Sequence, residues 1–461
     1  MRPTPASSPL RAIALPLVVI ALALAPATAA RAAGDARPLT LHAAYKLALG
    51  SNPTIELLDQ RVRAVEAARR AAWVALKPTA GVQLAYTYYN QRIALDPADF
   101  IPAGLVPPAN LPGEIVIQQR NQLSLSAQVN VPLFRGAAYQ GIGAARRQVA
   151  AARLRRVRSR RDFLLQIARA YYGTLSAREV VRALDGKVKL DERNMRAAKA
   201  RRSVGAAPRS DVMRADLVLT QDRQALRRAR IEERAAQRQL AILVGVPGRV
   251  APAAPASQPA SQPAAAAAPA VSLSRALERR NDYRASAVAV EAARSQRRAV
   301  WWSFAPNLDL TWSYRFSQVA GFAPSRGAWN LVLALTLPLY DGGERYAKLS
   351  QTEARVASER AQRRVLRQNI EQQLVTLRAE VVAAHSGVLA AHKALALATT
   401  TASDMSERYA AGSATQLDVL DASQRRLQAD LDLTRSRYRL EVARLALAHA
   451  AGRFRPLSAS R

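Results

Sequence analysis

Apolar and polar residues alternate strictly along two stretches of the chain. From Gln122 to Val131 every second residue is Leu, Ala or Val and the residues between them are polar, and Leu308 to Ser317 alternates in the same way. Val82 to Tyr89 and Trp329 to Leu337 alternate less strictly. A period of two is that of a β-strand. The pattern predicts four strands, at about residues 80–93, 115–131, 307–319 and 327–338.

The faces of these strands favour a membrane barrel. One apolar and one polar face over about ten residues fits a strand between lipid and a water-filled lumen, although a half-buried strand of a soluble sandwich alternates identically. Each half of the chain offers one hairpin, too few strands for a sandwich. Aromatic residues crowd the strands, as they do at membrane interfaces: Tyr86, Tyr88, Tyr89, Trp312, Tyr314 and Trp329.

Four strands are too few to close a barrel, and an unpaired strand edge is not tolerated in lipid. About eight strands are the minimum for a filled barrel, and an open pore needs more. The strand count therefore requires several copies of the chain, and three copies of four strands would supply twelve strands.

The remaining pattern is helical. Leu417, Leu420, Leu427, Leu431 and Tyr438 follow the spacing of a coiled coil. The stretch 137–203 would extend for about 100 Å as a helix. The predicted helices cover about residues 40–76, 137–203, 208–244, 272–303, 343–409 and 415–451.

The chain is an internal duplication. Three motifs recur: Trp73 to Pro78 as Trp301 to Pro306, Val131 to Gly136 as Leu337 to Gly342, and Gly205 to Val212 as Gly412 to Val419. The halves are 37–250 and 271–455, and the Pro/Ala/Ser-rich segment 251–270 between them is expected to be a linker. A Pro-rich loop, 96–113, accounts for most of about 22 extra residues in the first half.

The N-terminus predicts export. Residues 1–33 combine early arginines, the apolar run Ala12 to Ala25 and the small residues Ala27-Thr28-Ala29, as a cleaved signal peptide does. No later run of about 18 apolar residues without charge predicts a membrane-spanning helix. The chain has no cysteine, which excludes disulfides, thiolate metal sites and a lipid anchor on cysteine.

The charge and the residue types of the chain argue against a nucleic-acid-binding protein, an enzyme and a metal-binding protein. The formal charge of +34 would suggest nucleic acid as a partner, but an exported protein rarely meets it, and the charge lies mainly on helices. The four histidines are scattered, so we expect no catalytic centre, no metal site and no cofactor. A periplasmic structural coiled-coil or adaptor protein is the alternative function; it fits the helix hairpins and does not explain the alternating strands.

Export, duplicated halves, one strand hairpin per half and helix pairs meeting at a Gly-containing turn together resemble the TolC family of outer-membrane efflux proteins. Its motifs here are Ala48 to Pro53, the two strand-to-helix turns, and the two tip motifs Val204 to Val212 and Tyr409 to Ala422. The resemblance covers about Leu39 to Gly452.

The resemblance implies an α+β membrane protein, a homotrimer with duplicated halves in each chain. Its twelve-stranded transmembrane β-barrel, four strands per chain, would continue into a long periplasmic barrel of coiled-coil helices. Such a protein is a passive conduit in the bacterial outer membrane and not an enzyme. It docks onto a periplasmic membrane-fusion adaptor and an inner-membrane pump, for efflux or type I secretion. The cargo, whether drugs, metals or proteins, stays open.

The resemblance also places a periplasmic entrance, or gate, at Asp211, Tyr409, Asp418 and Asp421. Asp418 and Asp421 share a helix face, so threefold symmetry would make a cation-attracting ring. For Asp211 and Asp418, helix capping alone is an equal alternative, because Thr415 to Asp418 forms a capping-box pattern. For Asp421, one turn further along, a pore-lining role is favoured.

The helix-tip turns are expected to carry the adaptor contact. Gly205 and Gly412 would leave each helix with positive φ. Ala414 stands where some family members carry a basic lock residue, which puts an Asp–Arg lock there in doubt. The turn residues are Val204, Gly205, Pro208, Ser210, Gly412, Thr415 and Leu417.

Overall fold

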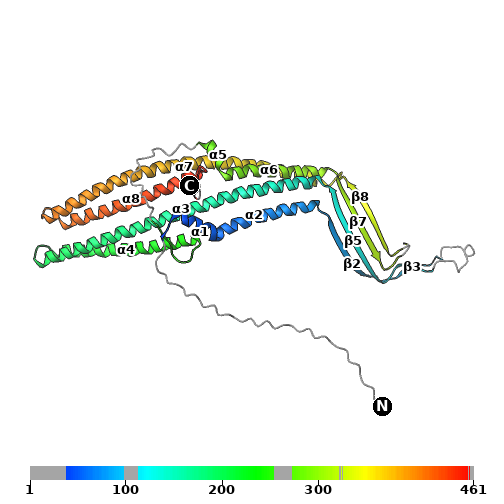
Figure 1. Ribbon diagram of the computed structural model, residues 1–461, viewed down its shortest axis with the longest axis horizontal. Helices are drawn as coiled ribbons and strands as arrows, with labels where there is room; N and C mark the ends of the chain where they lie inside the picture. The colour runs from blue at the N-terminus through cyan, green and yellow to red at the C-terminus, as the bar shows by residue number, and fades with distance from the viewer. Residues whose placement is uncertain are drawn as a thin grey trace, which may run out of the picture.

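The computed structural model describes residues 38–97, 113–253, 272–320, 323, 325–454 and 456. The predicted signal peptide, nearly all of the Pro-rich loop and most of the predicted linker lie outside the described residues. The molecule is elongated, with a sheet at one end and two long helix hairpins reaching away from it (Figure 1).

A four-stranded antiparallel sheet forms the first end. Its order is β2-β5-β7-β8, so the strand hairpins of the two halves lie side by side. The register sets Val82 opposite Ala127, Ala127 opposite Tyr314, and Tyr314 opposite Trp329, which makes one face apolar across all four strands. The strands are β2 (Thr79–Tyr88), β5 (Asn121–Phe134), β7 (Asn307–Ser317) and β8 (Gly327–Thr336).

The two predicted strands of the first half are each interrupted. β3 (Ile93–Leu95) and β4 (Ile115–Gln118) pair only with each other and extend beyond the main sheet (Figure 1). The pairing of β2 and β5 stops at Tyr88 and Asn121, and the β3–β4 ladder shifts register between Ile93 and Ala94. Runs of consecutive polar residues, 90–92 and 118–122, lie at these breaks, so the sequence carried a signal for them that the strand prediction passed over.

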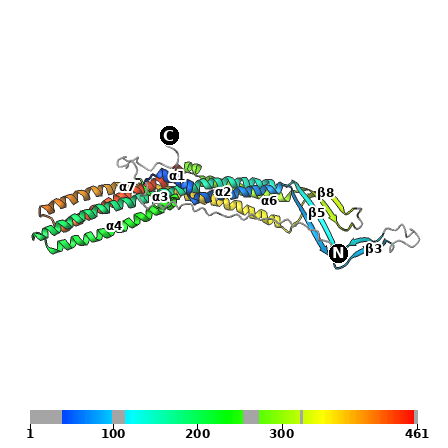
Figure 2. The ribbon, with the colours of Figure 1, turned by 60° about the horizontal axis from the view of Figure 1, so that its bottom comes forward.

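Two helix hairpins form the other end and run side by side in both views (Figures 1 and 2). Their long arms continue directly from the sheet, and shorter helices accompany the sheet-proximal half of each arm. The hairpins are α3 (Gly136–Ser203) with α4 (Arg209–Val244), and α7 (Glu344–Ala410) with α8 (Gln416–Ala450). The accompanying helices are α2 (Pro53–Ala72) and α6 (Asn281–Trp301).

Two predicted helices are each two helices in the structure. The stretch 40–76 contains α1 (Leu41–Ser51), α2 and a 3-10 turn, because Asn52 is extended before Pro53 and caps α2 through Thr54 N at 2.8 Å. The stretch 272–303 contains α5 (Leu273–Arg279), α6 and a 3-10 turn, with Arg280 extended between the helices.

The predicted linker begins too early. Ala251–Pro252 form β6, which pairs in parallel with β1 (Pro38–Leu39). Tyr171 donates from its hydroxyl to the Ala253 carbonyl at 2.7 Å, and Arg178 donates to the Pro252 carbonyl at 3.1 Å. These contacts anchor residues 251–253 on α3.

Among the described residues, α7 is the one helix that is long and apolar enough to cross a membrane by length and composition alone. Its best 18-residue window has a mean hydropathy of 1.4 and is 11% buried in the chain. Its longest stretch without Asp, Glu, Lys or Arg is 381–392, so the expectation of no uncharged run of about 18 apolar residues still holds for α7. α7 packs along α6 and α8 in the helical part of the molecule.

Candidate functional site at the hairpin tips

Both hairpin tips turn through a glycine in the left-handed region. Gly205 has φ 74° and Gly412 has φ 80°. In each tip the residue after the glycine donates its N–H back to a helix carbonyl, Ala206 to Arg201 at 2.8 Å and Ser413 to Arg408 at 2.9 Å. A side chain at either glycine would strain the turn, so these residues shape the backbone.

The second tip carries a capping box. The Thr415 hydroxyl accepts from Asp418 N at 3.3 Å, and the Asp418 carboxylate accepts from Thr415 N at 2.9 Å and from the Thr415 hydroxyl at 2.7 Å. These hydrogen bonds hold the pKa of Asp418 below its usual value. Asp418 is therefore the N3 residue of the capping box, with Thr415 as the N-cap residue of α8, and the lowered pKa favours its ionised form.

The other two carboxylates each lie near an arginine on their own helix. Asp211 is in the first turn of α4, 3.9 Å from Arg214, and Asp421 is 2.9 Å from Arg425. The Asp421–Arg425 pair is exposed, and exposed pairs are weak. Arg214 and Arg425 were not among the predicted site residues, although their spacings of three and four residues from Asp211 and Asp421 indicate such pairs.

One contact joins the two hairpins near their tips. The guanidinium of Arg201, on α3, stacks on the ring of Tyr409, on α7, at 4.2 Å from the ring centre. A guanidinium over an aromatic face is attracted by the ring electrons. Arg201 was not among the predicted site residues, since no local signal pairs residues that far apart.

The remaining tip residues are exposed and shape the end of the molecule. Pro208 is the N-cap residue of α4, followed by Arg209 and Ser210 in its first turn. Val204 is 77% exposed and Leu417 54% exposed, so each tip presents an apolar side chain to its surroundings. Single exposed apolar residues are common on protein surfaces, so this exposure by itself assigns no contact.

Three buried charges lie behind the tips. Lys187 forms an ion pair with Asp191 and lies 3.1 Å from Asp222, all within the α3–α4 hairpin. Burial and the hydrogen bond with Asp222 raise the pKa of Asp191 to about 6, against the opposing effect of Lys187. The ammonium group of Lys187 is thus shared by the carboxylates of Asp191 and Asp222.

This cluster makes stability depend on pH. The folded pKa of Asp191 is above the unfolded value of about 3.9, so its contribution is fully present below about pH 4 and is lost as the pH rises through about 6. We expect Asp191→Asn to raise the free energy of unfolding at pH 7.5 by about 2 kcal/mol and to flatten its pH dependence, measured by denaturant titration. Asp185→Asn is the control: Asp185 is half-buried and its hydrogen bond with Lys189 lowers its pKa, so its contribution to the free energy of unfolding depends on pH with the opposite sign.

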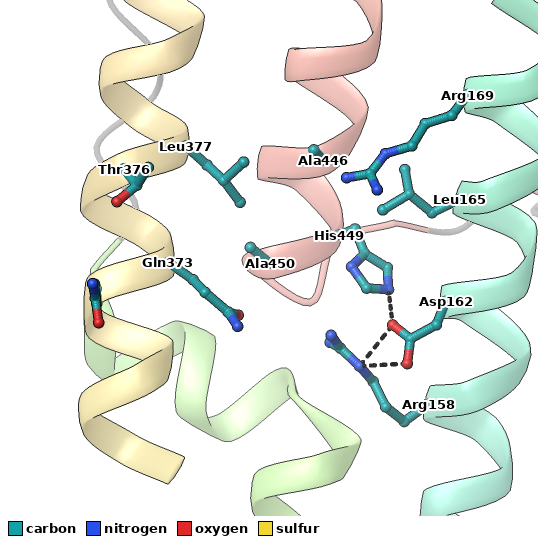
Figure 3. A pocket seen from close by; sticks show the side chains of 11 residues that line it. Arg158, Asp162, Leu165, Arg169, Gln373, Thr376, Leu377, Ala446, His449 and Ala450 are labelled. Atoms are coloured by element: carbon teal, nitrogen blue, oxygen red, sulfur yellow. Dashed lines mark hydrogen bonds and ion pairs between the residues drawn. The ribbon is translucent and has the colours of Figure 1, made fainter. Parts of the chain in front are cut away.

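A second polar feature lies where α8 ends and α6 begins. A cavity of about 470 Å³ opens there between α3, α7 and α8 (Figure 3). His449 Nε2 lies 2.9 Å from Asp162 and Arg158 Nε lies 3.0 Å from Asp162. Burial would raise the pKa of Asp162, but these two partners lower it below its usual value. The contacts brace the end of α8 against α3.

The comparisons with known proteins bear directly on this architecture. The family model described as "Outer membrane efflux protein" matches residues 44–246 and 272–453. The chain belongs to the outer membrane efflux protein family. The matched region is interrupted where the two halves of the chain are joined, and it includes both hairpin tips.

Individual relatives agree with the family. The outer membrane efflux protein BepC of Brucella suis biovar 1 (strain 1330) is 26% identical over 334 residues, 72% of each chain. The outer membrane protein VceC of Vibrio cholerae has a TM-score of 0.72 at 20% identity, covering 89% of this chain and 96% of its own. The open state of the Neisseria gonorrhoeae MtrE outer membrane channel has a TM-score of 0.70 at 19% identity, covering 89% and 88%.

The resemblance to the TolC family is confirmed. As an outer membrane efflux protein the chain is a channel of the outer membrane, with its helical part in the periplasm. Within the described residues no group of three or more His, Asp or Glu side chains is placed to hold a metal ion.

Proposed function

We propose that three copies of this outer membrane efflux protein close a twelve-stranded barrel. The edge strands β2 and β8 have a neighbour on one side only within the described residues. Their apolar faces are open, with Val82 73% and Leu335 69% exposed. An edge in lipid must be paired, and joining β8 of one copy to β2 of the next pairs every edge.

The helices continue the same arrangement into the periplasm. α7 lies at the margin of the chain and carries exposed apolar residues along its length, among them Val375, Val382, Leu389 and Leu397. A neighbouring copy covers this face in the proposed trimer, which accounts for an apolar helix outside the lipid. The helices then enclose a tunnel that extends the barrel by about 100 Å, judged by the length of α3.

The tips form the periplasmic entrance. In a trimer, Asp211, Asp418 and Asp421 each occur three times around the axis, and Tyr409 with Arg201 ties the two hairpins of each copy together. This carboxylate ring attracts cations, and separation of the hairpins widens the entrance. The single observation that carries this proposal is the Arg201–Tyr409 contact at the level of the acidic residues.

The exposed turns dock onto a periplasmic membrane-fusion adaptor, which connects the channel to an inner-membrane pump. The contact residues are those of the two turns: Val204, Gly205, Pro208, Ser210, Gly412, Thr415 and Leu417. Val204 and Leu417 supply apolar anchors, and the glycines and caps hold them in place. The chain is then a passive conduit of a tripartite efflux system, driven by the pump.

The acidic entrance has a direct test. We expect Asp421→Ala to weaken block by a trivalent cation in planar bilayers about tenfold, because three carboxylates leave the ring at once. Asp432→Ala is the matched control, since Asp432 is similarly exposed on α8, three turns further from the tip. Unchanged block and ion selectivity in Asp421→Ala would remove this residue from the entrance.

A further inference from the structure

A second cavity, of about 330 Å³, lies between α6 and α7 at the sheet end of the helices. α6 ends at Trp301 and α7 begins at Glu344, so the cavity lies within about 25 Å of the sheet-proximal ends of both helices. The side chains that line it are Arg294, Arg297, Arg298, Glu353, Val356, Ala357 and Arg360.

The lining is strongly basic. Arg294 pairs with Glu291 at 2.5 Å and Arg297 lies 3.5 Å from Glu353. Arg298 donates to the Ser295 hydroxyl at 2.9 Å and to the Gln140 side-chain oxygen at 3.4 Å. Within the described residues neither Arg298 nor Arg360 forms an ion pair with a carboxylate. Four arginines against two carboxylates leave two positive charges in excess at this cavity.

The first half of the chain has an ion pair at the positions that correspond to Arg294 and Arg360. The Trp73 and Trp301 motifs align Glu66 with Arg294. The tip glycines Gly205 and Gly412 are 207 positions apart (412 − 205). The same separation aligns Arg153 with Arg360, and buried Val149 with buried Val356. Glu66 and Arg153 form a salt bridge of 2.6 Å between α2 and α3.

In the second half both members of that pair are arginines. Where the first half has an ion pair between α2 and α3, the second half therefore has two positive charges that line one cavity between α6 and α7. Like charges around a common space repel each other and gain from an anion between them. Guanidinium groups present planar forks of N–H donors that match the oxygens of a phosphate.

The position of the cavity indicates where such a phosphate is found. Trp301 lies seven and four residues beyond Arg294 and Arg297, so the three side chains share one face of α6. Trp301 is 60% exposed at the junction of helix and sheet. Exposed tryptophans mark the level of a membrane interface, where lipid phosphates also lie.

We infer that the α6–α7 cavity is a binding site for a phosphate group, held by Arg294, Arg297 and Arg360. The phosphate is supplied by a phospholipid headgroup or by free inorganic phosphate; both present the same oxygens to the arginines. The site is separate from the hairpin tips and does not depend on the proposed entrance.

The test uses the full-length, detergent-solubilised protein. Arg294→Glu recreates at this position the pair that Glu66 and Arg153 form in the first half, so it is expected to fold. We expect it to weaken binding of phosphatidylglycerol at least tenfold, measured by native mass spectrometry, and to leave binding of diacylglycerol, which lacks phosphate, unchanged. Inorganic phosphate is titrated separately by phosphorus NMR.

Arg355→Glu is the control, because Arg355 is exposed on α7, is not among the residues that line the cavity, and gives the same change of charge. Loss of phosphatidylglycerol binding in Arg294→Glu alone supports a lipid site, and parallel loss of inorganic phosphate binding supports a free-phosphate site. Equal binding by wild type and Arg294→Glu overturns the inference, as does an equal loss in Arg355→Glu. The double variant Arg294→Gln/Arg360→Gln repeats the test without a new carboxylate.

Discussion

Replacing Leu310 by arginine is expected to abolish assembly in the outer membrane. Leu310 lies on the apolar face of the sheet, opposite Val131 on β5 and Leu333 on β8. An arginine on the lipid face of a barrel costs about 2–4 kcal/mol near the bilayer centre. A trimer carries three copies of the change, so the cost is about 6–12 kcal/mol, comparable to the whole stability of many proteins.

Thr311→Arg is the matched control. Thr311 is the next residue on β7 and lies opposite Asn130, on the other face of the sheet. We expect this variant to assemble, because the opposite face is proposed to line a water-filled lumen. The measurement is the amount of heat-modifiable oligomer in outer-membrane fractions. Normal assembly of Leu310→Arg would show that this face does not contact lipid.

Breaking the Arg201–Tyr409 contact is expected to open the channel. A cation–π contact contributes about 1 kcal/mol, so three copies contribute about 3 kcal/mol. If the three hairpin pairs open together, the ratio of closed to open channels falls about a hundredfold in Arg201→Ala. Single-channel conductance in planar bilayers measures the change, and susceptibility of cells to large antibiotics provides a second readout.

Two substitutions of the same tyrosine separate this mechanism from general loosening of the tip. Tyr409→Phe keeps the aromatic face and should behave as wild type, whereas Tyr409→Leu loses it and should open like Arg201→Ala. The double variant Arg201→Ala/Tyr409→Leu should be no more open than either single variant. Additive opening in the double variant would mean that the two residues act independently.

Local patterns in the sequence identified the main elements of the fold. The alternation of Leu308 to Ser317 has a period of two, and the coiled-coil spacing from Leu417 onward has a helical period, so each can be assigned without knowing its neighbours. The capping box of Thr415 and the glycine turns are local as well, because all their hydrogen bonds lie within a few residues.

The interruptions of these elements were missed. Asn52 and Arg280 break helices whose apolar periodicity continues on both sides, since each side chain is held by distant partners: Asn52 donates to the Leu243 carbonyl at 2.8 Å, and Arg280 to the Ala450 carbonyl at 3.3 Å. Residues 251–253 have linker composition and still pair with β1 and bind α3. For Arg280 and residues 251–253 the deciding partner is far away in the chain, whereas the break at Asn52 also has a local signal, the proline that follows it.

The sequence by itself thus determined the strands with one apolar face, the long helix hairpins and their glycine turns, because periodicity and turn chemistry act over short distances. It also determined that four strands need partners. Only the tertiary structure decided which charges meet. It joined Arg201 to Tyr409, brought Asp222 to the Lys187–Asp191 pair, and set Arg294 and Arg360 around one cavity. Such contacts depend on how helices pack side by side, and no spacing along the chain encodes that.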